Sequence, residues 1–108
     1  MKVKILGEEL EIRFNMAVEI GYEDIIGEAF DVTQLDKQKN SIALYMSAII
    51  ANNPDTKVTM ERLLTEASGH EIAQLSNAVV DAMTEWMKMP AVTSEEQKDE
   101  EGDVEKNA

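Results

Sequence analysis

The stretch SIALYMSAIIANNPD, residues 41–55, decides the fold because it describes a helix with apolar residues on two sides. One side holds Ile42, Tyr45, Met46 and Ile49, and the other holds Leu44, Ala48 and Ala51. A helix with one apolar stripe packs on one neighbour, so a helix with two such stripes has to be covered twice. Pro54 cannot continue a helix and disfavours helical angles at Asn53. We therefore predict a central helix over residues 38–52.

The preceding stretch, AVEIGYEDIIGEAFD at residues 17–31, predicts a covering helix over residues 16–30. Its apolar stripe is Val18, Tyr22, Ile25, Ile26 and Ala29. Asn15 is in place to cap its start. Gly21 and Gly27 each cost about 1 kcal/mol relative to alanine in a helix, and either permit close backbone packing or mark an irregular helix. The acidic residues Glu19, Glu23, Asp24, Glu28 and Asp31 lie off the stripe and are interpreted as solvated charge.

The N-terminal residues 2–14 predict a β-hairpin, because apolar and charged residues alternate there. Val3, Ile5, Leu10, Ile12 and Phe14 would share one face. Gly7 and Glu8 are expected to form the turn. Since an isolated two-stranded hairpin is marginal in water, its apolar face should pack on the helices.

Two further helices are expected after the central one. Thr59 would cap a short helix over residues 60–67, and Ser68 with Glu71 forms a capping box for a long helix that Pro90 ends. The fold class is therefore mainly α: an N-terminal hairpin packed on about four helices, as one domain over residues 1–90. Residues 91–108, AVTSEEQKDEEGDVEKNA, are predicted to be a disordered acidic tail, because they offer too little apolar surface to offset the entropy of ordering.

The charge balance restricts the partners. Ten basic and 22 acidic residues give a net charge of −12, which repels nucleic-acid phosphates and anionic lipid. The charge either keeps the chain soluble or favours a basic protein partner. No apolar run is long enough for a membrane span, and the N-terminus is unlike a signal peptide. We expect a soluble intracellular protein that binds neither nucleic acid nor membrane.

Catalytic, cofactor and metal sites are not expected. The chain has no cysteine and one histidine, His70, so a transition-metal site lacks its preferred ligands. There is no calcium-loop spacing of acids and no glycine-rich phosphate loop. Ser68 beside His70 is better explained as a helix cap than as a nucleophile. An enzyme is therefore not predicted.

A partner-binding surface is the remaining hypothesis. Met83, Trp86, Met87 and Met89 cluster at the end of the last predicted helix. Methionine adapts to varied apolar partners and tryptophan is a frequent anchor of interfaces. The alternative is that Met83 and Trp86 complete the core while Met87 and Met89 lie at its edge. Ile20 projects among acids, away from its helix stripe. We predict Ile20, Trp86, Met87 and Met89 as partner contacts.

The order of these elements resembles the tail assembly chaperones of long-tailed bacteriophages and related prophages. The resemblance covers residues 1–89: a hairpin, then EIRFNMAVEIGYEDIIGEAFD, then IALYMSAIIANNPD, a short helix and a longer one. It is a resemblance of pattern, and the matching positions Tyr22, Gly27, Tyr45 and Asn53-Pro54 are interpreted as structural.

The resemblance implies a non-enzymatic role in the cytoplasm of a bacterial host. Such proteins bind the long, aggregation-prone tape measure protein and keep it soluble while the tail tube assembles, and are not expected in the mature virion. The tail tube protein is a further implied partner, and homo-oligomerisation stays open. The competing hypothesis is a small acidic regulatory or inhibitory protein, such as an antitoxin or a DNA mimic. Acids in a floppy tail argue against rigid mimicry, and no basic DNA-binding segment is present.

Overall fold

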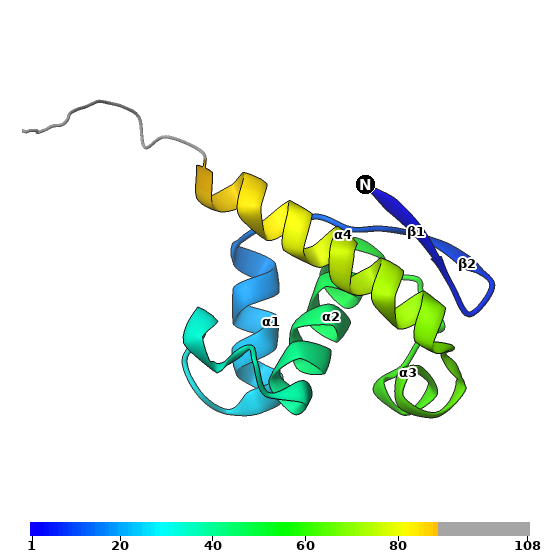
Figure 1. The fold of residues 1–108 in the computed structure, drawn as a ribbon, viewed down its shortest axis with the longest axis horizontal. Helices are drawn as coiled ribbons and strands as arrows, with labels where there is room; N and C mark the ends of the chain where they lie inside the picture. Colours follow the sequence, from blue (N-terminus) through cyan, green and yellow to red (C-terminus); the bar gives the residue numbers. More distant parts are fainter. Residues whose placement is uncertain (89–108) are drawn as a thin grey trace, which may run out of the picture.

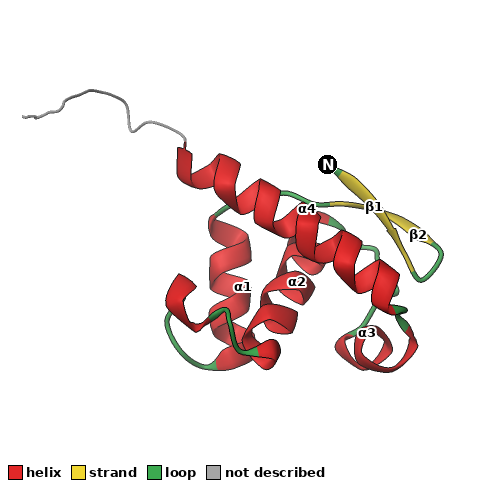
Figure 2. Cartoon of the chain, in the orientation of Figure 1, coloured by secondary structure: helices red, strands yellow, loops and turns green. Residues whose placement is uncertain are grey.

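The structure, a computed structural model, describes residues 1–88 and is mainly helical with an N-terminal hairpin (Figures 1 and 2). The elements are β1 (Lys2–Ile5), β2 (Glu8–Glu11), α1 (Met16–Ile26), the 3-10 turn η1 (Val32–Gln34), α2 (Gln38–Asn52), α3 (Met60–Glu66) and α4 (Gly69–Lys88). The predicted fold class is confirmed for this part of the chain. Met89, Pro90 and the predicted tail at residues 91–108 lie outside the described residues.

The hairpin has the predicted alternation but a different turn. β1 and β2 pair antiparallel with Ile5 opposite Glu8, so the two loop residues are Leu6 and Gly7. Both have positive φ, 52° and 84°, as a type I′ turn requires. The prediction of a Gly7-Glu8 turn was wrong by one residue, because the I′ geometry places a left-handed residue before the glycine as well. Ile5 and Leu10 on the inner face are buried.

Side chains from two distant segments hold the hairpin. The Asn53 amide, at the end of α2, accepts a hydrogen bond from the Glu11 N–H at 2.9 Å and donates one to the Glu11 carbonyl at 2.8 Å. At the turn, the Leu6 N–H donates to Glu71 Oε2 at 2.7 Å. Glu71 Oε1 meanwhile accepts from the Ser68 N–H at 2.9 Å, which confirms the predicted capping box at the start of α4. One carboxylate thus caps a helix and fixes the hairpin.

α1 is shorter than predicted. It begins at the predicted Asn15 cap, whose side chain accepts from the Val18 N–H, but it ends at Ile26 rather than near residue 30. Gly27 takes the left-handed conformation with φ 83°, and its N–H donates to the Glu23 carbonyl at 2.7 Å. A glycine adopts this conformation without the penalty of a Cβ, so it terminates the helix instead of weakening its interior. Ala29 therefore leaves the predicted stripe and is exposed.

α1 and α2 cross closely at Gly21. A Cβ added to Gly21 would lie 2.3 Å from Ser47 Oγ, and that hydroxyl donates to the Val18 carbonyl at 2.6 Å. A second bond runs from Asn40 Nδ2 to the Tyr22 hydroxyl at 2.7 Å, in the buried interior. Of the two roles considered for Gly21, the structure shows close backbone packing.

α2 has the predicted bounds and is covered on several sides, as Figure 1 shows with α1 beside it and α4 across it. Its buried residues are Asn40, Ala43, Leu44, Met46, Ser47, Ala48 and Ile49. Ala51 was predicted to be packed and is instead exposed, because it lies in the last turn. Ile42 and Tyr45 are only half-buried. This partial exposure leaves an apolar side of α2 open to the surface.

Candidate functional site

The predicted contact residues fall into two environments. Ile20 on α1 and Met87 on α4 are each 53% exposed. Trp86 is half-buried against the core, with its ring centroid 6.3 Å from that of Phe14. Met89 lies outside the described residues. Trp86 therefore lies at the edge of the core, whereas Ile20 and Met87 are exposed on α1 and α4, and their role as partner contacts stays a prediction.

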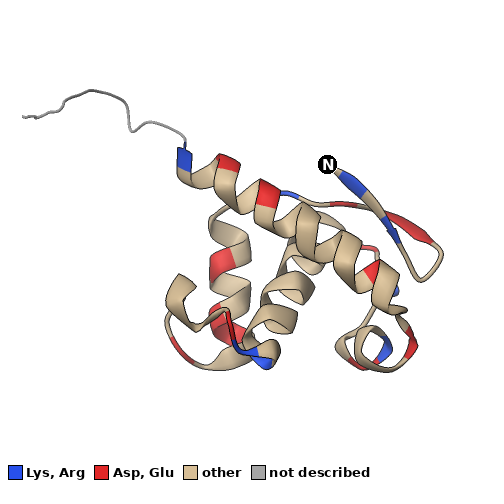
Figure 3. Cartoon of the chain, in the orientation of Figure 1, with Lys and Arg blue, Asp and Glu red and all other residues tan. Residues whose placement is uncertain are grey.

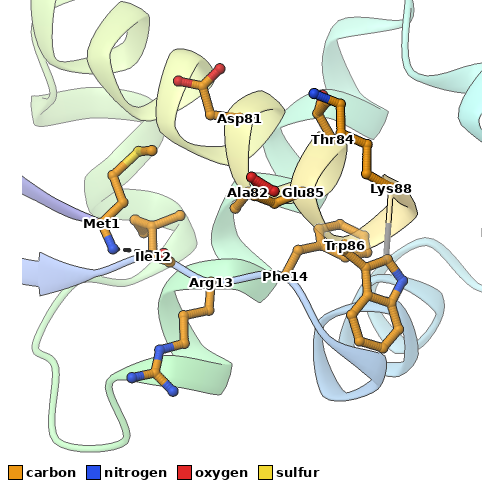
Figure 4. A pocket seen from close by; sticks show the side chains of 10 residues that line it. All are labelled: Met1, Ile12, Arg13, Phe14, Asp81, Ala82, Thr84, Glu85, Trp86 and Lys88. Atoms are coloured by element: carbon orange, nitrogen blue, oxygen red, sulfur yellow. Dashed lines mark hydrogen bonds between the residues drawn. The ribbon is translucent and has the colours of Figure 1, made fainter. Parts of the chain in front are cut away.

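Trp86 lines an open groove of about 700 Å³ between α4 and the segment that follows β2, which we call the Trp86 groove (Figure 4). Its lining is Met1, Ile12, Arg13, Phe14, Asp81, Ala82, Thr84, Glu85, Trp86 and Lys88. Trp86 also ends a row of neighbouring aromatic rings. The ring centroids of Phe14 and Phe30 are 5.8 Å apart, and those of Phe30 and Tyr22, which pack edge to face, are 5.4 Å apart. The groove is thus rimmed by both signs of charge, and its aromatic wall is a structural continuation of the core.

A second apolar surface lies along the half-buried side of α2, in two grooves. The α1-side groove, about 500 Å³, is lined by Ile25, Ile26, Gln38, Lys39, Ile42, Ala43, Met60 and Leu64. The α4-side groove, about 560 Å³, is lined by Gln38, Ser41, Ile42, Tyr45, Leu63, Leu64, Ala67, Gly69, Ile72, Ala73 and Ser76. We call the pair the α2 grooves. They meet at Gln38, Ile42 and Leu64, which line both grooves.

The side chains and helices that form the walls of the α2 grooves are held in place by hydrogen bonds and core packing outside the grooves. Tyr45 is fixed by a 2.8 Å hydrogen bond from its hydroxyl to Ser76 Oγ on α4. α3 begins where Thr59 Oγ1 accepts from the Arg62 N–H at 3.1 Å, as predicted, and Leu63 is its one buried residue. With Leu63 pointing inward, the adjacent Leu64 is 61% exposed. Ile25, on the α1 side, is 42% exposed.

The α2 grooves differ from the rest of the surface in charge. Of the described residues, no Asp or Glu lines either groove, and Lys39 is the one charged residue in their walls. In Figure 3, acidic residues mark α1, α3, α4 and the hairpin, whereas α2 is uncharged beyond its first turn. In a chain of net charge −12, this leaves an apolar surface that an apolar partner can cover without desolvating a carboxylate.

Several acids outside the grooves have structural roles. A hydrogen bond from the Thr56 hydroxyl lowers the pKa of Glu8, and one from the N-terminal ammonium lowers the pKa of Glu11. The Ser68 N–H, followed by the Leu6 N–H, lowers the pKa of Glu71. Within residues 17–31, Glu23 accepts from the Phe30 N–H at 2.9 Å, and a hydrogen bond from the Thr33 hydroxyl lowers the pKa of Asp31. Those two acids are thus turn-forming groups, whereas the sequence had indicated only solvated charge.

Residues 1–88 contain neither a metal-binding cluster nor a membrane-spanning helix. No cluster of three or more histidine or acidic side chains in this range is arranged to hold a metal ion, and His70 is exposed. No helix within it is long and apolar enough to cross a membrane.

No protein family model, curated protein or solved structure matches the chain.

Proposed function

We propose that this protein is a chaperone for an apolar helical client, and that it acts as a tail assembly chaperone, keeping a tape measure protein soluble in the host cytoplasm while the tail tube forms. The observation that carries the proposal is the pair of acid-free α2 grooves on an otherwise strongly acidic protein. The resemblance of residues 1–89 to tail assembly chaperones supplies the identity of the client.

The division of charge suits such a role. A long apolar helix presents side chains at spacings of three and four residues, and shallow apolar grooves accept such side chains. The net charge of −12 elsewhere on the chain keeps loaded complexes apart in solution. Because no acid is among the described residues that line the grooves, client binding leaves that charge exposed to solvent.

The direct test is co-expression with the product of the next long reading frame, which the proposal expects to be the tape measure protein, with the soluble fraction of that client as the readout. We expect the client to be largely soluble with the wild-type protein and largely insoluble without it. Equal solubility in both cases would contradict the proposed function.

A matched pair of variants then locates the surface. Leu64→Glu and Met87→Glu each add one acid in place of a large apolar side chain that is more than half exposed. We expect Leu64→Glu to lose client solubilisation and Met87→Glu to retain it. The reverse result would move the client site to the predicted surface around Trp86 and Met87.

Salt dependence separates this role from that of an acidic inhibitor of a basic protein. Apolar binding should change little between low and high salt, whereas binding through the negative charge should weaken steeply. A steep loss of client affinity with salt would favour the regulatory alternative.

A further inference from the structure

The two α2 grooves are separated by a ridge rather than by a gap. Gln38, Ile42 and Leu64 line both grooves, so these residues form their common wall. Leu64 is 61% exposed, the largest exposed fraction among the large apolar side chains of the described chain. A partner that fills both grooves therefore has to pass over a protruding leucine.

The charge of this surface is also uneven. Lys39 lines the α1-side groove, and the described lining of the α4-side groove has no charged residue. A carboxylate on the partner would meet a positive group at one end of the surface only. Because this attraction is available in only one of the two α2 grooves, it distinguishes one end of a bound helix from the other.

We propose that the α2 grooves select a helix by register: one large apolar side chain enters each groove, small residues face Leu64, and a carboxylate lies next to Lys39. Residues i and i+7 lie on one face of a helix about 10.5 Å apart, and i+3 and i+4 lie between them. In the proposed register the large side chains are at i and i+7, and the small ones are at i+3 and i+4. Leu64 packs between them as a knob packs into a hole. The inference rests on the proposed function and specifies the client segment.

The first test uses synthetic helical peptides of alanine and glutamine with two leucines seven residues apart, alanine at the two positions between them on that face, and a glutamate one turn outside each leucine. The control peptide has the same composition, with the second leucine exchanged for a glutamine on the opposite face. Since one buried leucine is worth roughly 10- to 100-fold in affinity, we expect the matched peptide to bind at least about tenfold more tightly. Equal affinities would overturn the register.

The second test enlarges the two peptide side chains that face Leu64 and then shortens Leu64 itself. Changing the two central alanines of the peptide to leucine should weaken binding to the wild-type protein by about tenfold, because the new side chains collide with Leu64. The Leu64→Ala variant should restore that binding, and Leu64 is exposed enough for the variant to fold normally. Failure of Leu64→Ala to restore binding would overturn the role of the ridge.

The third test concerns Lys39. Replacing both peptide glutamates by glutamine should weaken binding to the wild-type protein about two- to fivefold, as for an exposed ion pair, and should strengthen binding to Lys39→Glu. If the wild type and Lys39→Glu had the same ratio of affinities for the glutamate and glutamine peptides, the carboxylate contact would be overturned. If all peptides bind alike while client solubility still depends on Leu64, the register is wrong and the proposed function stands. If client solubility does not depend on Leu64, the proposed site itself is wrong.

Discussion

The Trp86 groove and the α2 grooves are both open and largely apolar. They differ in how far their lining side chains pack into the core and in the charged residues that line them. The Trp86 groove ends an aromatic row that begins inside the core, and Asp81, Glu85, Arg13 and Lys88 line its rim. The α2 grooves have no acid among their described lining residues. Their most exposed large apolar side chain, Leu64, is 61% exposed and so contributes little to the core. A half-buried tryptophan at a groove can thus belong to the core, and the lack of acidic lining residues favours the α2 grooves as the proposed partner surface.

The largest change in stability is expected from removing the Trp86 side chain. Trp86→Ala removes a half-buried ring from Phe14 and should lower the free energy of unfolding by about 2–3 kcal/mol, somewhat less than for a fully buried tryptophan. Urea unfolding followed by far-UV circular dichroism measures this. Met87→Ala, at the exposed neighbour, should stay within about 0.5 kcal/mol of the wild type. If both changes were equally mild, Trp86 would not be part of the core.

A smaller effect is expected at the start of α4, which borders the α4-side groove through Gly69 and Ile72. In Glu71→Gln, one carboxylate oxygen becomes an NH₂ group that faces the N–H of Ser68 or Leu6. The free energy of unfolding should fall by less than in Trp86→Ala, because one of these two backbone N–H groups loses its acceptor. Asp24→Asn, an exposed acid on α1, is the control and should be close to neutral.

The same residue gives a pH dependence with a defined sign. Because the pKa of Glu71 is lowered in the folded protein, its stabilisation is fully present above its unfolded pKa of about 4.3 and is lost as the pH falls through the folded pKa. The stability difference between the wild type and Glu71→Gln should therefore shrink below about pH 4.3. A difference that stays constant down to acid pH would contradict the assigned hydrogen bonds.

The smallest effect concerns Gly21→Ala at the α1–α2 crossing, which positions the α1-side groove. Its effect on the free energy of unfolding should change sign when Ser47 is also replaced. Gly21→Ala forces Ser47 Oγ away from the Val18 carbonyl and should destabilise by about 1 kcal/mol, after allowing for the better helix propensity of alanine. In a Ser47→Ala background the nearest remaining atom is the Cβ of residue 47, which lies at 3.4 Å in the wild-type structure, an ordinary contact. There the same change should stabilise by about 0.5–1 kcal/mol. Identical effects in both backgrounds would exclude the close approach.

Local signals in the sequence predicted most of the fold. The bounds of α2 followed from its two apolar sides and Pro54, and the caps at Asn15, Thr59 and Ser68 followed from residue type. The end of α1 and the hairpin turn were missed because both depend on left-handed backbone. A glycine such as Gly27 can be an interior residue or a cap, and nothing local marks Leu6 for positive φ.

The candidate site was less predictable, because it forms between elements. Trp86 is conspicuous in the sequence, whereas the α2 grooves combine Ile25, Ile42, Leu64 and Ile72 from four helices. Their relative position follows from packing that no single segment specifies. One signal could have indicated them: no acid occurs between Asp36 and Asp55, in a chain with 22 acidic residues.

An NMR titration with a soluble helical segment of the client, followed at the isoleucine methyl groups and the Trp86 indole, shows which groove the client enters. We predict that the methyl signals of Ile25, Ile42 and Ile72 shift, because these side chains line the α2 grooves. The signals of Ile12 and Trp86, in the other groove, should stay in place. Shifts at Ile12 and Trp86 with none at Ile25, Ile42 and Ile72 would contradict the account and locate the client in the Trp86 groove.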